Sequence, residues 1–263
     1  MDYKLTLLLF CLSVPGVIAS SFLMLPLVVD PTTTPVSLQT LQIANLIQGA
    51  LFVLLAAILA SILTKRVGLC SLTLLTLINH GRVIHAFYPQ LISGLVGGLI
   101  GVAIIVGFHF LSPPPLANTQ VLLSPPIAVR ILYGGITEEI LIRWGMMTLI
   151  VWASWRLIQK GKGKPNNIVI GLAIRISAVL FGLSHVPLAI NSITPLSMAI
   201  IVYIVAGNTG NTMFGVMAGY LSLVLWFGVC HHCPRIFPYR LISNTWLGES
   251  DHIRFHPKSV DFY

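Results

Sequence analysis

The sequence predicts an all-α protein, a polytopic transmembrane bundle of about six to eight helices. Of its 263 residues, 56% are hydrophobic and only 8% are charged, and the mean hydropathy is +0.91. Apolar stretches long enough to cross a bilayer recur along the chain, separated by short polar turns. This composition excludes an ordinary soluble domain and predicts that the lipid bilayer is the protein's solvent.

The charge balance points to basic loops rather than to nucleic-acid binding. The net charge of +8 comes from 15 lysines and arginines against 7 acidic residues, and the basic clusters are short and lack interleaved aromatic residues. The four cysteines are too few and too scattered to predict a disulfide framework. We therefore expect no nucleic acid among the partners.

The first two spans are expected at residues 5–29 and 41–63. A signal peptide is the competing interpretation of 5–29, but no A-x-A-like cleavage site stands out, which favours a retained span. The second span ends in Thr64-Lys65-Arg66, and the positive-inside rule assigns this end to the cytoplasm. The N-terminus is then cytoplasmic, and we expect a multi-pass protein in the plasma membrane of a prokaryote.

The next part of the chain allows two interpretations. Residues 67–88 fit either an interfacial segment or part of a long tilted helix. Residues 91–111 form a third predicted span, and this span is rich in glycine, as are helices that pack closely in lipid.

Three further helices are expected in the second half. Residues 127–158 end in a second basic cluster, and the charge again predicts a cytoplasmic end. Residues 168–190 and 195–225 form the fifth and sixth predicted spans. The basic cluster consists of Arg156, Lys160, Lys162 and Lys164.

These patterns divide the chain into three parts. Residues 1–126 are expected to be N-terminal transmembrane helices, residues 127–225 the core helices that carry the chemistry, and residues 226–263 an atypical soluble-like tail. The tail holds four of the eight histidines and two of the four cysteines, and it has no periodic apolar pattern. The composition of the tail therefore differs from that of the rest of the chain.

An adjacent acidic pair inside the fourth predicted span is the strongest functional signal. Glu138 and Glu139 are the sole acidic residues between Asp30 and Glu249. An ionisable group at membrane depth costs at least a few kcal/mol, so such a pair marks a candidate functional site. On an α-helix Glu139 and Arg143 lie one turn apart and can form an ion pair, whereas Glu138 points elsewhere and is left free for chemistry.

His185 is the best partner for Glu138. A buried carboxylate and an imidazole that share a water molecule make a general-base site for amide hydrolysis. A membrane transporter that uses Glu138 as a proton site fits the spacing equally well. The residues by themselves leave a hydrolase and a transporter open.

A family resemblance favours the hydrolase. Glu138-Glu139-x-x-x-Arg143, followed by Phe181-x-x-x-His185, resembles the first two signatures of the CPBP family of intramembrane endopeptidases. This family is also called the CAAX prenyl protease, bacteriocin-processing or Abi family. Gly215-Val216-Met217-Ala218-Gly219-Tyr220-Leu221 resembles the segment that leads into the third signature.

The resemblance implies a protease with named residues. Glu138 and His185 would be catalytic, Glu139 and Arg143 would support them, and membrane-associated peptides or proteins would be the substrates, in CAAX-type or bacteriocin-related processing. No cofactor is expected. Zinc is not favoured, because one histidine and two glutamates are a thin ligand set for this metal.

The third signature is disrupted. The family helix with its histidine is replaced by a stretch that contains Cys230-His231-His232-Cys233, so His231 and His232 are the remaining candidates for oxyanion stabilisation. One hypothesis is that this stretch is translated out of frame. Reading compatible codons with a one-nucleotide shift permits YGLESAIIAHASFHIV, which resembles the expected helix, and the alternative function is then an inactive, frame-shifted family member.

Overall fold

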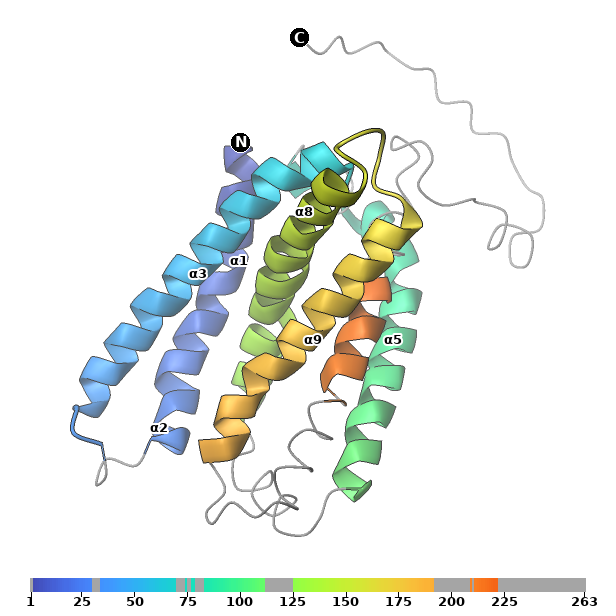
Figure 1. Cartoon of the computed structure of the whole chain (residues 1–263). Helices are drawn as coiled ribbons and strands as arrows, with labels where there is room; N and C mark the ends of the chain where they lie inside the picture. Colours follow the sequence, from blue (N-terminus) through green and yellow to red (C-terminus); the bar gives the residue numbers. More distant parts are fainter. Residues whose placement is uncertain are drawn as a thin grey trace.

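The fold is an all-α bundle, as the sequence predicts (Figure 1). The computed structural model describes residues 2–29, 34–69, 74, 77–78, 83–111, 125–191, 209 and 211–221. In these ranges the regular structure is helical and no strand occurs. The predicted tail, residues 226–263, lies outside them.

The helices follow one another along the chain with short connections. Within the described ranges they are α1 (Tyr3–Ala19), η1 (Ser20–Met24), α2 (Leu25–Val28), α3 (Leu38–Val67), α5 (Val83–Leu111), α7 (Ile127–Val129), η2 (Arg130–Thr137), η3 (Ile140–Met147), α8 (Thr148–Ile158) and α9 (Asn167–Asn191). Residues 211–221 are also helical. The segments α1 to α2 form one continuous helix, and so do α7 to α8.

Three of the described helices are long and apolar enough to cross a membrane, which agrees with an integral membrane protein. They cover Tyr3–Val28, Leu38–Val67 and Asn167–His185. A shorter apolar helix covers Gly94–Gly107. The full count of six to eight spans stays a prediction.

The ambiguous stretch 67–88 is partly resolved by α5. This helix begins at Val83 and continues to Leu111, so residues 83–88 extend the third predicted span toward the N-terminus. With this addition the helix has 29 residues, against the 21 expected from the apolar run at 91–111. Of the two alternatives, the long helix is the one found for these residues.

Side-chain and glycine caps set the ends of the helices. Thr40 N–H donates to Ser37 Oγ at 3.2 Å at the start of α3, and Val169 N–H donates to Asn166 Oδ1 at 3.0 Å at the start of α9. The end of α3 is Gly68, whose φ of 73° is adopted most readily by a residue without a side chain.

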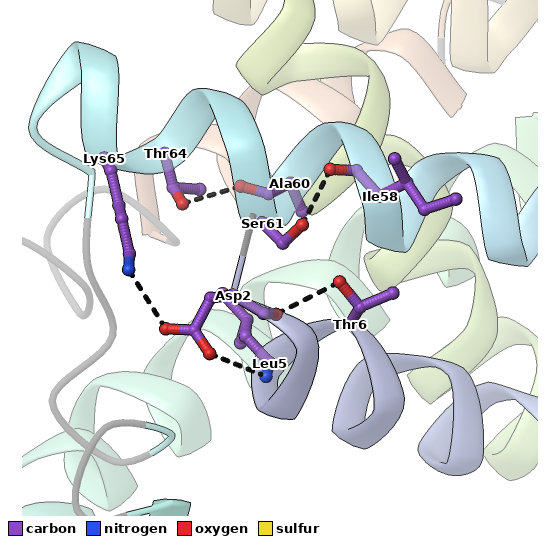
Figure 2. A network of polar contacts seen from close by, with 8 residues as sticks. All are labelled: Asp2, Leu5, Thr6, Ile58, Ala60, Ser61, Thr64 and Lys65. Atoms are coloured by element: carbon purple, nitrogen blue, oxygen red, sulfur yellow. Dashed lines mark hydrogen bonds and ion pairs between the residues drawn. The ribbon is translucent and has the colours of Figure 1, made fainter.

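Polar contacts tie the start of α1 to the end of α3 (Figure 2). Asp2 caps α1 by accepting a hydrogen bond from Leu5 N–H at 3.4 Å. The other carboxylate oxygen lies 3.2 Å from Lys65 Nζ in the last turn of α3. This ion pair holds the two helices together at one end of the bundle.

The helix that carries the acidic pair lies at the centre of the bundle. Its η3 segment packs against α1 and α3 in one apolar cluster, where Ile140 and Trp144 meet Leu9 and Ala60. In a second cluster, Met147 packs with residues at the end of α3 and on α9. The site residues are therefore surrounded by three other helices.

Two glycines let the backbones approach closely at this centre. A side chain at Gly16 of α1 would collide with Leu132 and Thr137 of η2. A Cβ at Gly145 of η3 would lie 2.6 Å from the Cβ of Ala56 on α3. Small residues at helix contacts are typical of membrane bundles, and here they bring α1 and α3 directly onto the central helix.

The glycine-rich helix α5 also packs closely, as predicted, but through two of its glycines only. Side chains at Gly97 and Gly101 would collide with Leu221 and Phe214 of the helix at 211–221. Gly94, by contrast, has nothing within 4 Å of the position of an added Cβ. The helix at 211–221 thus lies beside α5, with α9 on its other side (Figure 1).

Candidate active site

The acidic pair lies between two stretches of π-helix, which corrects the expectation of a regular α-helix. Residues 130–137 and 140–147 adopt the wider π-helical turn, in which hydrogen bonds join residues five apart, and Glu138 and Glu139 stand between them. Such turns are rare and occur frequently at functional sites. The hydrophobic pattern does not reveal them, because period-based reasoning assumes 3.6 residues per turn.

Threonine hydroxyls support both π-helical stretches. Thr148 Oγ1 donates to Arg143 O at 3.2 Å, five residues earlier. Thr137 Oγ1 lies 3.1 Å from Leu132 O, also five residues earlier, and 2.9 Å from Ser13 O on α1. The Thr137 hydroxyl therefore shares its proton between its own helix and α1, which fixes the backbone just before Glu138.

The predicted ion pair between Glu139 and Arg143 is confirmed. Glu139 Oε1 lies 3.4 Å from Arg143 Nη2, and the Arg143 side chain is only 2% exposed. Arg143 Nε and Nη2 nevertheless have no hydrogen-bond partner among the described residues. The guanidinium is thus fully buried with part of its donor capacity unused.

Glu138 stays outside this ion pair. Its side chain is half-buried, and the structure shows no ion pair or hydrogen bond of its carboxylate with any described residue. Its Oε2 lies 4.0 Å from the position that a Cβ would take at Gly134, one turn earlier. Gly134 and Gly135 are exposed and carry no side chain that could cover the carboxylate.

His185 on α9 is oriented by its own helix. Its Nδ1 lies 2.9 Å from Phe181 O and 3.3 Å from Ser184 Oγ. A carbonyl oxygen only accepts, so in the neutral ring this contact assigns the proton to Nδ1 and leaves the lone pair on Nε2. Ser184 Oγ donates to Phe181 O at 2.7 Å, which agrees with a helix-bound hydroxyl rather than a nucleophile.

Phe181 joins the two halves of the site. Arg143 Cζ lies 5.5 Å from the centre of the Phe181 ring, a distance at which a cation is attracted to the ring face. The same ring packs edge-on against the His185 ring, with 4.8 Å between centroids. The sequence motif contains Phe181 without indicating a role for it, although its spacing of four from His185 is a usable signal.

The third motif segment is found beside the second. A Cβ at Gly215 would lie 3.1 Å from Ala178 Cα, and one at Gly219 would lie 2.9 Å from Ile174 Cγ2. The helix at 211–221 therefore packs directly on α9. The candidate oxyanion residues His231 and His232 lie outside the described residues.

The described residues offer no metal centre of the usual kind. No three side chains of His, Cys, Asp or Glu gather as ligands in this part of the chain. The expectation that the protein works without a cofactor stays a prediction.

An arginine and two glutamates lie between apolar helices, and the arginine faces the Phe181 ring of the neighbouring helix. These features define a class: an α-helical integral membrane protein with a polar site inside the bundle. Residues 120–233 match the family model described as "Type II CAAX prenyl endopeptidase Rce1-like". Over these residues the chain is similar to the CAAX prenyl protease family, as the motifs predict. No curated protein and no solved structure matches the chain.

The match contains all four predicted site residues from Glu138 to His185, together with Phe181 and the helix at 211–221. It ends at Cys233, so it includes the first residues of the predicted tail and both candidate oxyanion histidines. The family is one of membrane proteases, which implies hydrolysis of peptide or protein substrates.

Proposed function

We propose that this protein is an intramembrane endopeptidase in which Glu138 and His185 together activate a water molecule. The observation that carries the proposal is the contact series from Glu139 through Arg143 and Phe181 to His185, because it links the two motif helices in the region that matches a protease family. The substrates would be membrane-associated peptides or proteins of the CAAX or bacteriocin-related type.

Glu138 suits the role of general base. Its carboxylate has no partner in the described structure, and the glycines of the preceding turn leave room beside it. In the proposed reaction it takes a proton from water while the water oxygen bonds to the carbonyl carbon of the peptide. When the carbon–nitrogen bond breaks, that proton passes to the leaving amine.

His185 suits the role of a fixed acceptor. With its proton on Nδ1 bound to Phe181 O, its Nε2 can accept a hydrogen bond from the same water and orient it. Phe181 and Arg143 would then act as positioning residues, because they contact the catalytic candidates or their neighbours rather than the substrate.

The remaining parts of the proposal concern the oxyanion and the membrane setting. His231 or His232 would stabilise the oxyanion if the chain is active as written. We also propose a multi-pass protein of a prokaryotic plasma membrane, with the N-terminus in the cytoplasm, since the basic clusters lie at that end of the helices.

A cleavage assay tests the mechanism. The purified full chain is reconstituted in liposomes with a quenched fluorescent peptide that carries a prenylated CAAX terminus. Glu138→Gln should lower the cleavage rate by about a hundredfold or more, and His185→Ala should also lower it strongly. Leu183→Ala, which changes an exposed apolar residue of the same helix, is the matched control and should stay close to the original rate.

Two results would decide against the proposal. Full activity of Glu138→Gln would exclude Glu138 as the general base. Proton flux that depends on Glu138, in the absence of peptide cleavage, would favour the transporter. If the chain as given is inactive but a version with the shifted frame restored cleaves the peptide, the protein is an inactive member of the protease family.

A further inference from the structure

Cationic side chains gather at one end of the bundle. The start of α1, the end of α3, and the connection from α8 to α9 lie at this end (Figure 1). Asp2 is the only acidic residue that the described chain places here, and Lys65 already neutralises it. The exposed cations at this end are Lys4, Lys65, Arg66, Arg156, Lys160, Lys162 and Lys164.

Three of these cations belong to one short connection, residues 159–166, which we call the lysine loop. In it lysine and glycine alternate from Lys160 to Lys164. The positive φ angles of Lys160, Gly161 and Gly163, between 53° and 70°, fold the chain back on itself. The three lysine side chains are exposed.

The backbone of the lysine loop is held in place by two side chains. Trp155 Nε1–H donates to Gly163 O at 3.1 Å and lies 3.4 Å from Lys162 O. Gln159 Nε2–H donates to Lys164 O at 3.2 Å, while Gln159 Oε1 accepts from Asn166 N–H at 2.9 Å. The loop is therefore ordered before it meets any ligand, which lowers the entropy cost of binding.

Exposed apolar side chains border the lysine loop on both helices. Leu157 and Ile158 of α8 are 81% and 54% exposed, and Ile168 of α9 is 73% exposed. In a membrane protein such side chains lie in the hydrocarbon, so the lysines just beyond them lie at the level of the lipid headgroups.

We propose that the lysine loop is a binding site for the headgroups of anionic phospholipids. Exposed lysines on a loop with a fixed backbone, beside exposed apolar side chains, match a phosphate with its acyl chains attached. An acidic protein segment would match the charges but would leave the apolar border unexplained. Each lysine near an anionic membrane surface strengthens binding by about fivefold, so the loop can select anionic from zwitterionic lipid.

Native mass spectrometry of the full chain in detergent tests this proposal. The protein is titrated with phosphatidylglycerol or, separately, with phosphatidylcholine, and the lipid retained is measured. Lys160→Gln/Lys162→Gln should weaken the apparent affinity for phosphatidylglycerol by about 25-fold, about fivefold for each lysine, and leave that for phosphatidylcholine unchanged. Lys160→Arg/Lys162→Arg should retain the preference, which separates charge from folding.

The matched control is Lys4→Gln/Arg66→Gln, which removes the same charge from exposed positions at the same end of the bundle. It should change the affinity by no more than about twofold. An equal loss of affinity for phosphatidylglycerol in both double variants would overturn the proposal. The preference would then come from the overall positive charge at this end of the bundle and not from the lysine loop. Equal binding of soluble glycerophosphoglycerol would also overturn it, as would displacement of the lipid by a poly-glutamate peptide.

Discussion

Two ion pairs in this protein have the same chemistry and opposite surroundings. Asp2 and Lys65 meet at the water-facing end of α1 and α3, and their side chains are 24% and 67% exposed (Figure 2). Glu139 and Arg143 meet inside the bundle, and their side chains are 35% and 2% exposed. The distances, 3.2 and 3.4 Å, hardly differ.

The surroundings decide what each pair is worth. An exposed pair contributes about 0 to 1 kcal/mol, because water solvates either partner when the other is removed. A buried pair costs desolvation to form, but the loss of one partner strands the other charge. Removing one partner of the Asp2–Lys65 pair should therefore change the stability little. Removing one partner of the Glu139–Arg143 pair should destabilise the fold, because it leaves the other charge buried and unpaired.

The largest effect is expected from Glu139→Leu. This change leaves the Arg143 guanidinium buried without its ion-pair partner, and it should lower the free energy of unfolding by about 3 to 5 kcal/mol. Loss of helicity by circular dichroism during titration with a denaturing detergent measures it. Asp2→Asn is the control from the exposed pair, and an equal loss there would contradict the contrast between the two pairs.

The double variant Glu139→Leu/Arg143→Leu should recover most of that stability. Removing both charges leaves no stranded ion, and an apolar pair of similar size is often neutral relative to a buried ion pair. The same denaturation curves measure the recovery. If the double variant is as unstable as the single one, the loss comes from packing and not from an unpaired charge.

A smaller effect is expected from Phe181→Leu. The change removes the aromatic face beside Arg143 and should cost about 1 to 2 kcal/mol, the range of a partly desolvated cation–π contact. The cost should shrink when Phe181→Leu is made in a protein that already carries Arg143→Leu. An unchanged cost in that background would show that the ring acts through packing only.

The smallest effect belongs to the exposed pair and depends on pH. Burial alone would raise the pKa of Asp2, but the hydrogen bonds from Lys65 and Leu5 together with the Lys65 charge hold it below 3.8. The Asp2 carboxylate thus stabilises the fold above pH 3.8, and this contribution is lost as the pH falls through the lower folded pKa.

Thermal midpoints at about pH 6 and pH 3 measure this contribution. The midpoint should fall more in the original protein than in Asp2→Asn, which has no carboxylate to protonate. Lys65→Gln should lower the midpoint slightly at the higher pH. A pH response that is the same with and without Asp2 would contradict this assignment.

Much of the fold and part of the site can be predicted from the sequence. Long apolar runs force helices, because backbone polar groups in lipid must be satisfied within the segment. The ion pair between Glu139 and Arg143 follows from their local spacing. The motif that contains His185 and Phe181 predicts a resemblance to the CAAX prenyl protease family, and the match at residues 120–233 agrees with this prediction.

Other features depend on contacts between distant parts of the chain, which the spacing of residues along one segment does not predict. The π-helical turns around Glu138 depend on contacts such as the hydrogen bond of Thr137 to Ser13 O, a residue 124 positions away. The choice of Gly97 and Gly101 as contact points of α5 depends on where the helix at 211–221 lies.

The sequence alone determined that two carboxylates and an arginine would lie among apolar helices, because the hydrophobic effect and the spacing act along one chain segment. Only packing decided that the Phe181 ring would stand between Arg143 and His185, since that contact joins two helices whose relative rotation no single segment encodes.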